Sequence, residues 1–165
     1  VPNDTTKYMQ NVATMKYTYD MISDAYYDGR TICIFRLSDV ILCKAEIENN
    51  LNGPAAALPY LNQIRARAGA PEYGKHNRFP APSTKEAMND AILKERGYEL
   101  VFEFQRRADL IRFGKYEEVV NAHLKKLGIA QPTNVTSSLR YFPYPLNDAQ
   151  LNPNLAAENP SRLPK

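Results

Sequence analysis

The sequence predicts a mainly α-helical fold, because of the spacing of its apolar residues, its helix-ending signals and one helix-starting motif. Between residues 36 and 68, apolar residues recur three or four positions apart in two neighbouring stretches. The segment "NNLNGP" separates these stretches, and Asn and Gly commonly end helices. Farther along, "STKE" has the spacing of a capping box before a third helical stretch. Strand-like alternation is weak and is confined to "MKYTY".

Composition and charge exclude several classes of protein. The 165 residues are 44% hydrophobic and 24% charged, which is typical of a folded chain and argues against disorder throughout. A net charge of +3, with acids interleaved among the bases, predicts no nucleic-acid partner. No apolar run of about 18 residues could span a membrane, and no Cys or His cluster is typical of a metal site. We therefore expect neither a metal nor a cofactor.

Two helices are predicted after a polar region. Residues 1–35 are rich in tyrosine and predict a loop region with at most one short strand. The first helix, Arg36–Leu51, has a stripe at helical spacing that comprises Leu37, Val40, Ile41, Lys44, Ala45 and Glu48. The second helix is Pro54–Ala68, with a proline suited to the first turn. Its stripe comprises Ala57, Leu61, Ile64 and Ala68.

Two antiparallel helices within about 34 residues have the size of one tetratricopeptide repeat. One such unit cannot bury its own apolar face and has to stack on neighbours. The predicted fold is therefore a mainly α, tetratricopeptide-like helical scaffold.

The third helix is predicted to begin at a capping box of Ser83 and Glu86 and to continue through "KERGYELVFEFQRRADLIRFG". It is apolar on two sides, so we expect a central helix sandwiched between others. One side comprises Ala87, Ala91, Tyr98, Phe102 and Phe113, and the other comprises Leu93, Leu100, Phe104 and Ile111.

A fourth helix in "KYEEVVNAHLKKLG" completes the predicted helical region, residues 36–128. Residues 129–165 form an irregular tail with too many prolines and asparagines for regular structure. Apolar residues at intervals predict that this extended tail packs on the helices. Cys33 and Cys43 fit no zinc or redox motif, so buried free thiols are the preferred interpretation and a disulfide is the alternative.

The third helix is unusual in placing charges beside its apolar residues. Glu95, Glu99 and Glu103 are four residues apart, and like charges at this spacing destabilise a helix unless they are paired. Interspersed arginines favour a buried ionic network that fixes how the helices dock, with pairs such as Glu103 and Arg106. The residues of this network are Glu95, Arg96, Glu99, Glu103, Arg106, Asp109 and Arg112. The alternative is a glycosidase pair, which needs two carboxylates with pKa values pushed apart in a cleft.

Four stretches occur in a characteristic order: "IFRLSDVILCKAEIENN", "ALPYLNQIRARAGA", "EAMNDAILKERGYELVFEFQRRADLIRFGK" and "YFPYPLNDAQLNPNLAAENP". Together they resemble the C-terminal region of the SusD/RagB family, outer-membrane nutrient-binding lipoproteins of the Bacteroidetes type. The resemblance extends over residues 35–160. It implies that the charged helix is internal to a scaffold with tetratricopeptide repeats. The sequence departs from the family pattern at Gly97, usually larger, at Phe104 and Gln105, commonly Gly-His, and at Arg107, often aromatic.

Proteins of this family are attached to the cell surface through an N-terminal lipidated cysteine. They form a lid over a SusC-like TonB-dependent transporter and capture oligosaccharides, or sometimes peptides. The resemblance therefore implies a non-enzymatic binding protein that is part of an outer-membrane lipoprotein about three times as long. The chain opens on "VPNDTTKY" without Met, signal peptide or anchor cysteine, which favours a processed chain or a piece of a longer one. A helical-repeat scaffold for protein partners is the alternative.

A glycan ligand would favour aromatic faces for its C–H surfaces and polar groups for its hydroxyls. The chain has no Trp, so tyrosines and a neighbouring arginine are the candidates. The residues expected to contact ligand are Tyr17, Tyr19, Tyr26, Tyr27, Tyr73 and Arg78. Ordinary packing of tyrosine under a loop is the competing interpretation.

Overall fold

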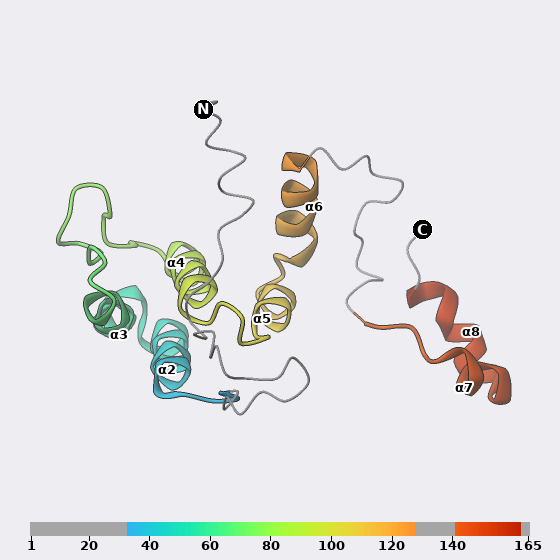
Figure 1. The fold of residues 1–165 in the computed structure, drawn as a ribbon. Coiled ribbons are helices and arrows are strands. Elements are labelled where there is room, and N and C mark those ends of the chain that lie inside the picture. Colours follow the sequence, from blue (N-terminus) through green and yellow to red (C-terminus); the bar gives the residue numbers. More distant parts are fainter. Residues whose placement is uncertain (1–32, 128–140, 163–165) are drawn as a thin grey trace, which may run out of the picture. The chain divides into compact units, whose positions relative to one another are not determined.

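The computed structural model describes residues 33–127 and 141–162. All regular elements in these ranges are helices, which confirms the predicted mainly α-helical class. Every described helix belongs to the unit Phe35–Lys165. Figure 1 shows these helices coloured along the sequence. The stacking expected of tetratricopeptide repeats stays a prediction.

The first two helices, α2 (Leu37–Asn52) and α3 (Pro54–Arg67), lie almost at the predicted bounds. They pack side by side, as Figure 1 shows. Gly53 joins them with a φ of 87°, a conformation that residues without a Cβ adopt at little cost. Pro54 follows at the first helical position, where its missing N–H leaves no hydrogen bond unmade.

The buried face of α3 agrees with its predicted stripe, but the buried face of α2 does not. On α3, Ala57, Leu61 and Ile64 are buried, as their spacing predicts. On α2 the prediction is wrong for Leu37 and Val40, which are 72% and 60% exposed. The buried face of α2 instead comprises Ser38, Asp39, Leu42, Ala45 and Asn49. Asp39 of this face pairs with Arg96, and the Asn49 amide nitrogen donates to the Lys85 carbonyl, partners that spacing alone does not reveal. The Ser38 hydroxyl has no hydrogen-bond partner among the described residues.

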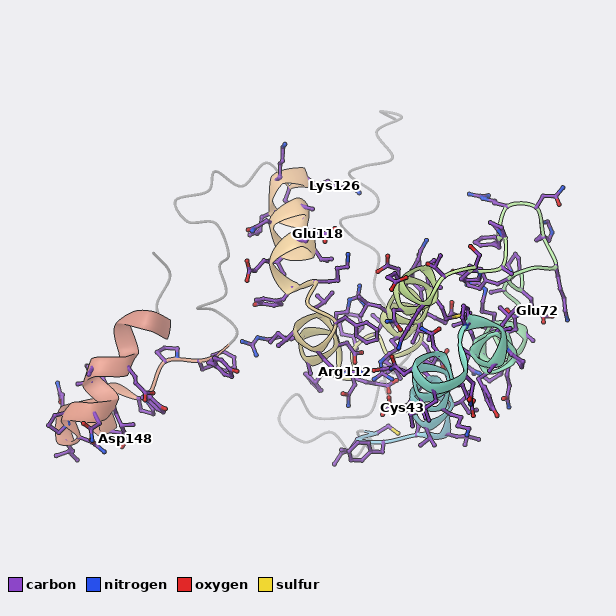
Figure 2. All side chains as sticks on the ribbon, turned by 180° about the vertical axis from the view of Figure 1, so that it is seen from behind. Cys43, Glu72, Arg112, Glu118, Lys126 and Asp148 are labelled. Atoms are coloured by element: carbon purple, nitrogen blue, oxygen red, sulfur yellow. The ribbon has the colours of Figure 1, made fainter. Side chains whose placement is uncertain are left out.

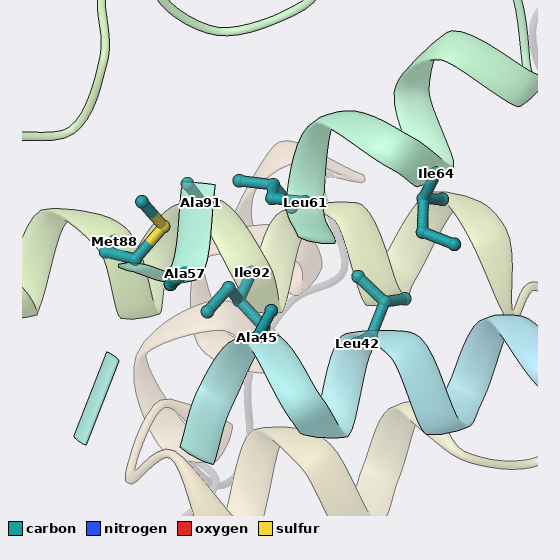
Figure 3. Close-up of a cluster of buried hydrophobic side chains, with 8 residues drawn as sticks. All are labelled: Leu42, Ala45, Ala57, Leu61, Ile64, Met88, Ala91 and Ile92. Carbon is teal, nitrogen blue, oxygen red and sulfur yellow. The ribbon is translucent and has the colours of Figure 1, made fainter. Parts of the chain in front are cut away.

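The core lies where α2, α3 and α4 (Lys85–Glu99) meet. Figure 3 shows its eight side chains, which are Leu42, Ala45, Ala57, Leu61, Ile64, Met88, Ala91 and Ile92. Met88 and Ile92 have no exposed surface, so each contributes about 1.5–3 kcal/mol of burial free energy. The third predicted helix is therefore central in its first half.

The N-terminus of α4 is capped one residue later than the sequence analysis predicts. Thr84 is the N-cap, with extended backbone (φ −116°, ψ 161°), and its Oγ1 accepts a hydrogen bond from the Ala87 N–H at 3.1 Å. The prediction of a capping box at Ser83 and Glu86 is therefore wrong. Both Ser and Thr are good N-caps, so composition did not distinguish these neighbours.

The third predicted helix is not continuous. It ends at Glu99, and a turn leads to α5 (Arg106–Arg112). Within the turn, Phe102 and Phe104 both have a φ of 61°, in the left-handed region that costs a side-chain-bearing residue about 1–2 kcal/mol. Phe104 stands where the resemblance to SusD/RagB proteins indicates that glycine is common, and glycine adopts this conformation readily.

The break changes which aromatic residues are buried. Tyr98, Phe102 and Phe104 were expected on buried faces, but they are 62%, 60% and 87% exposed. A helical wheel misplaces Phe102 and Phe104 because the chain leaves the helix after Glu99, whereas Tyr98 lies within α4 on its exposed side. Phe113, in contrast, packs against the core as expected.

Beyond α5, helix α6 (Tyr116–Lys126) confirms the fourth predicted helix. The tail differs from the prediction, because it contains α7 (Leu146–Leu151) and α8 (Pro153–Arg162). Proline stands just before or at the start of these two short helices, where it is compatible with helical structure. Packing of the tail on the other helices stays a prediction. Within the described ranges, no helix combines the length and the apolar content that a membrane crossing needs.

Both cysteines are free thiols, in agreement with the preferred interpretation. They are not fully buried as expected, because Cys33 is half-buried and Cys43 is exposed. The Cys43 sulfur lies 3.6 Å from Arg96 Nη1. Partial burial raises the pKa of the Cys43 thiol, against the opposing influence of Arg96.

Candidate functional site

Charged side chains of α4 and α5 form a connected set of ion pairs with α2. The Arg96 side chain, only 4% exposed, places Nε 2.8 Å from Asp109 Oδ2 and Nη1 2.8 Å from Asp39 Oδ1. On α5, Arg112 lies 3.0 Å from the second oxygen of Asp109 and also bonds to Glu46 of α2. Figure 2 marks Arg112 beside this part of the fold. These pairs tie α4 and α5 to α2.

The partners in this set keep each other ionised. Burial alone would lower the pKa of Arg96, but the hydrogen bond to Asp109 and the charge of Asp39 outweigh it, so the pKa is raised. The same balance raises the pKa of Arg112, whose partners are Glu46 and Asp109. Such a buried set adds little net stability, yet removing one member leaves a charge without compensation.

A second set of ion pairs gathers where α2 begins and where α3 and α4 end. Arg36, just before α2, donates from Nε to both Glu103 oxygens at 2.8 and 2.9 Å. Its Nη1 donates to Glu99 Oε1 at 2.5 Å, and its Nη2 donates to the Glu99 carbonyl oxygen. Arg67 of α3 donates to both Glu99 carboxylate oxygens at 2.7 Å. Two arginines therefore match the two carboxylates.

This matching bears on the glycosidase alternative. Burial would raise the pKa of Glu99, but Arg36 and then Arg67 outweigh it, so the pKa is lowered. A general acid in glycoside hydrolysis needs the opposite shift. Within the described ranges, no three His, Cys, Asp or Glu side chains gather as metal ligands would. The geometry suits a structural frame better than acid/base chemistry.

Arg65 of α3 connects the core with the loop of residues 68–84, named here the α3–α4 loop. Its Nη1 lies 2.6 Å from Glu95 Oε2, and both side chains are almost fully buried. Its Nε donates to the Pro71 carbonyl oxygen at 2.6 Å. The guanidinium carbon lies 4.6 Å from the Tyr73 ring centroid and 4.8 Å from that of Phe79, within cation–π range.

The same loop is also held by amide hydrogen bonds. The Asn62 side chain donates to the Tyr73 carbonyl at 2.9 Å and accepts from the Tyr73 N–H at 2.8 Å. The Gly74 N–H donates to the Phe79 carbonyl at 2.8 Å. The rings of Tyr73 and Phe79 meet edge to face, with centroids 5.9 Å apart. The loop therefore presents its aromatic residues in fixed positions.

Two adjoining hollows lie between the α3–α4 loop and α4. Their volumes are about 600 and 490 Å³. Four residues line both hollows: Tyr73, Arg78, Phe79 and Lys94. We call the pair the α4 groove. Each hollow has the size of a small-molecule pocket, which makes the groove the candidate ligand site of the described residues.

The structure places the residues expected to contact ligand in two ways. Tyr73 and Arg78 line the α4 groove together. The other four candidates, Tyr17, Tyr19, Tyr26 and Tyr27, lie outside the described residues.

Most of the predicted ionic residues form ion pairs, but in separate groups and with several partners other than the expected ones. Glu103 bonds to Arg36, far away in sequence, whereas a partner three residues away was expected. Arg106 donates to the Leu93 carbonyl at 2.7 Å. A Cβ on Gly97 would lie 2.8 Å from the Arg106 guanidinium, so the missing side chain leaves room for it.

The sequence analysis did not single out the distant partners of the acids, which are Arg36, Asp39, Glu46, Arg65 and Arg67. It also missed Phe79 and Lys94 in the α4 groove. The "RAR" of the second motif was the available signal, because two arginines near a helix end are suited to pair with a glutamate-rich neighbour.

Comparison with known proteins identifies the family. The SusD family matches residues 2–161. SusD-like protein P25 of Formosa agariphila is 39% identical over 120 residues, which cover 73% of this chain and 22% of that protein. Starch-binding protein SusD of Bacteroides thetaiotaomicron is 28% identical over 137 residues, covering 82% of this chain and 22% of that protein.

The matched part of the chain thus spans about a fifth of the length of these relatives. No solved structure matches the chain significantly. The family match covers nearly the whole sequence, and it agrees with the order of the four stretches and with the helical fold. The chain belongs to the SusD family.

Proposed function

We propose that this chain is part of a non-enzymatic cell-surface protein that captures oligosaccharides, or peptides, for import. The observation that carries this proposal is the family match over residues 2–161. A relative that covers most of the chain has the name starch-binding protein, which supports a glycan as ligand. The parent protein is an outer-membrane lipoprotein that delivers its ligand to a SusC-like TonB-dependent transporter.

In this proposal, the two sets of ion pairs and the separate Arg65–Glu95 pair form an internal frame and take no part in chemistry. Capture requires a surface that keeps its shape between ligands, because every side chain that has to be ordered on binding weakens the affinity. The buried pairs Arg65–Glu95 and Arg96–Asp109 support such a frame. The α4 groove, with Tyr73 and Arg78, is the ligand surface that the described residues contribute.

The proposal is tested on the source cells. An antibody raised against the chain is used to determine the mass of the parent protein, its membrane fraction and its cleavage by protease added outside intact cells. A larger, outer-membrane, protease-accessible protein is the expected result. A cytoplasmic protein of the size of this chain would refute the proposal.

A helical-repeat scaffold for protein partners is the second candidate, and one observation favours it. The outward face of α2 carries a stripe of exposed apolar residues, which are Leu37, Val40, Ile47 and Leu51. Exposed apolar surface of this kind is typical of packing interfaces. The cytoplasmic outcome of the fractionation experiment would favour this candidate.

A further inference from the structure

The α4 groove consists of two adjoining hollows, which limits the ligands that suit it. Its two hollows of about 600 and 490 Å³ adjoin at four shared residues. A single ion or one sugar unit would fill only part of this space. The groove therefore suits an extended ligand of several units.

Two of the three carboxylates that line the groove pair closely with arginines. Glu95 pairs with Arg65 at 2.6 Å, and Glu99 pairs with Arg67 at 2.7 Å. Asp90, beside the second hollow, lies 3.9 Å from Lys115. The negative charges of Glu95 and Glu99 are therefore largely balanced from within the protein, and Asp90, with a side chain 64% exposed, has a more distant partner.

Two cations of the groove, in contrast to Glu95 and Glu99, have no partner of opposite charge among the described residues. Arg78 and Lys94 line both hollows, and neither forms an ion pair with any side chain in the described ranges. Arg78 comes from the α3–α4 loop and Lys94 from α4, so they approach the groove from its two sides. The groove consequently has a surplus of positive charge where its hollows meet.

The groove also offers aromatic surface. Tyr98 lines the first hollow and is 62% exposed. Exposed aromatic faces suit the C–H surfaces of sugar rings. An arginine fork binds carboxylate or sulfate through two parallel hydrogen bonds, and lysine adds a point charge.

We propose that the α4 groove binds oligosaccharides bearing carboxylate or sulfate groups, with Arg78 and Lys94 contacting the anionic groups. This inference rests on the proposed function and narrows its ligand to acidic glycans. Charge-assisted hydrogen bonds supply the preference over neutral sugars, because those bonds are roughly twice as strong as neutral ones.

The experiment is calorimetric titration of the 165-residue chain with four probes. An oligogalacturonate and a sulfated carrageenan oligosaccharide test the two anionic groups, a malto-oligosaccharide of matched length is the neutral comparison, and polyglutamate is a polyanion without sugar. The variants are Arg78→Gln and Lys94→Gln. Lys125→Gln, on α6 and outside the groove, is the control for loss of one charge. Thermal unfolding checks that every variant is folded.

At least one acidic oligosaccharide is expected to bind more tightly than the neutral one, with affinity falling as salt is added. Arg78→Gln and Lys94→Gln are each expected to weaken this binding about tenfold, and Lys125→Gln to leave it unchanged.

Three results would overturn the inference. They are equal affinity for neutral and acidic oligosaccharides, unchanged affinity in both groove variants, and equal affinity for polyglutamate. Absence of binding to any of the probes would also overturn it for this groove. None of these results decides whether the parent protein is a surface capture protein, since the fractionation experiment answers that question separately.

Discussion

Replacing Arg96 with Met tests the internal frame most severely. The substitution keeps much of the side-chain length but removes a guanidinium that is only 4% exposed and lies 2.8 Å from two carboxylates. Those carboxylates, on Asp39 and Asp109, have side chains 13% and 4% exposed, so water cannot readily replace the arginine. Breaking a buried set in this way costs about 3–5 kcal/mol. A domain of this size has a total stability of about 5–15 kcal/mol, so the loss is large.

The assay is urea unfolding followed by circular dichroism, with two comparison variants. Lys94→Met changes an exposed cation on the same helix and is expected to cost less than about 0.5 kcal/mol. The triple variant Asp39→Leu, Arg96→Met, Asp109→Leu removes Arg96 together with both of its partners, leaves Arg112 paired with Glu46, and is expected to recover much of the lost stability. If Arg96→Met costs no more than Lys94→Met, the reasoning about a buried frame is wrong.

Three further predictions concern local features. Phe104→Gly should stabilise the protein by roughly 0.5–1 kcal/mol, because it relieves left-handed strain of about 1–2 kcal/mol against a glycine entropy cost of about 0.5–1 kcal/mol; a lower thermal midpoint than wild type would contradict this. Because the pKa of Glu99 is lowered, this carboxylate should stabilise the fold at pH values above its ordinary pKa of 4.5. This contribution should be lost as the pH falls below 4.5. Urea midpoints across pH should therefore fall more steeply in the wild type than in Glu99→Gln, and parallel curves would count against it. Thr84→Ala should cost about 1 kcal/mol and Ser83→Ala almost nothing, as measured by chemical unfolding, and the reverse order would return the cap to Ser83.

Local patterns predicted the helices that follow simple rules. The bounds of α2 and α3 followed from apolar spacing, from Gly53 and from Pro54, all of which act within a few residues. The buried face of α2 did not follow, because Asp39 is buried by virtue of its pairing with Arg96. Burial of a charge depends on a distant partner, and a helical wheel contains no information about that partner.

The break after α4 was missed for a related reason. Nothing in the residue types of Phe102 and Phe104 favours a left-handed backbone, so the periodicity was extended through them. The departure from the family pattern at Phe104 was the signal, because glycine at that place has a conformational meaning. The sequence analysis noted this departure but did not connect it with a left-handed backbone.

Some residues of the candidate site could be predicted from the sequence, and others could not. Arg78 and Tyr73 were predicted from residue type within one loop, and both line the α4 groove. Lys94 was not predicted, because its place opposite the loop depends on how α3 and α4 pack. The pairings of Glu99 with Arg36 and Arg67 join residues more than thirty positions apart, beyond the reach of a helical pattern.

We propose that this SusD family chain belongs to a protein that captures glycans at the cell surface. The most direct measurement is the binding of labelled oligosaccharides to intact source cells, with and without the gene for the parent protein. Deletion is expected to remove saturable surface binding of at least one oligosaccharide, and restoring the gene is expected to return it. Unchanged binding of every oligosaccharide that the cells take up would contradict the claim.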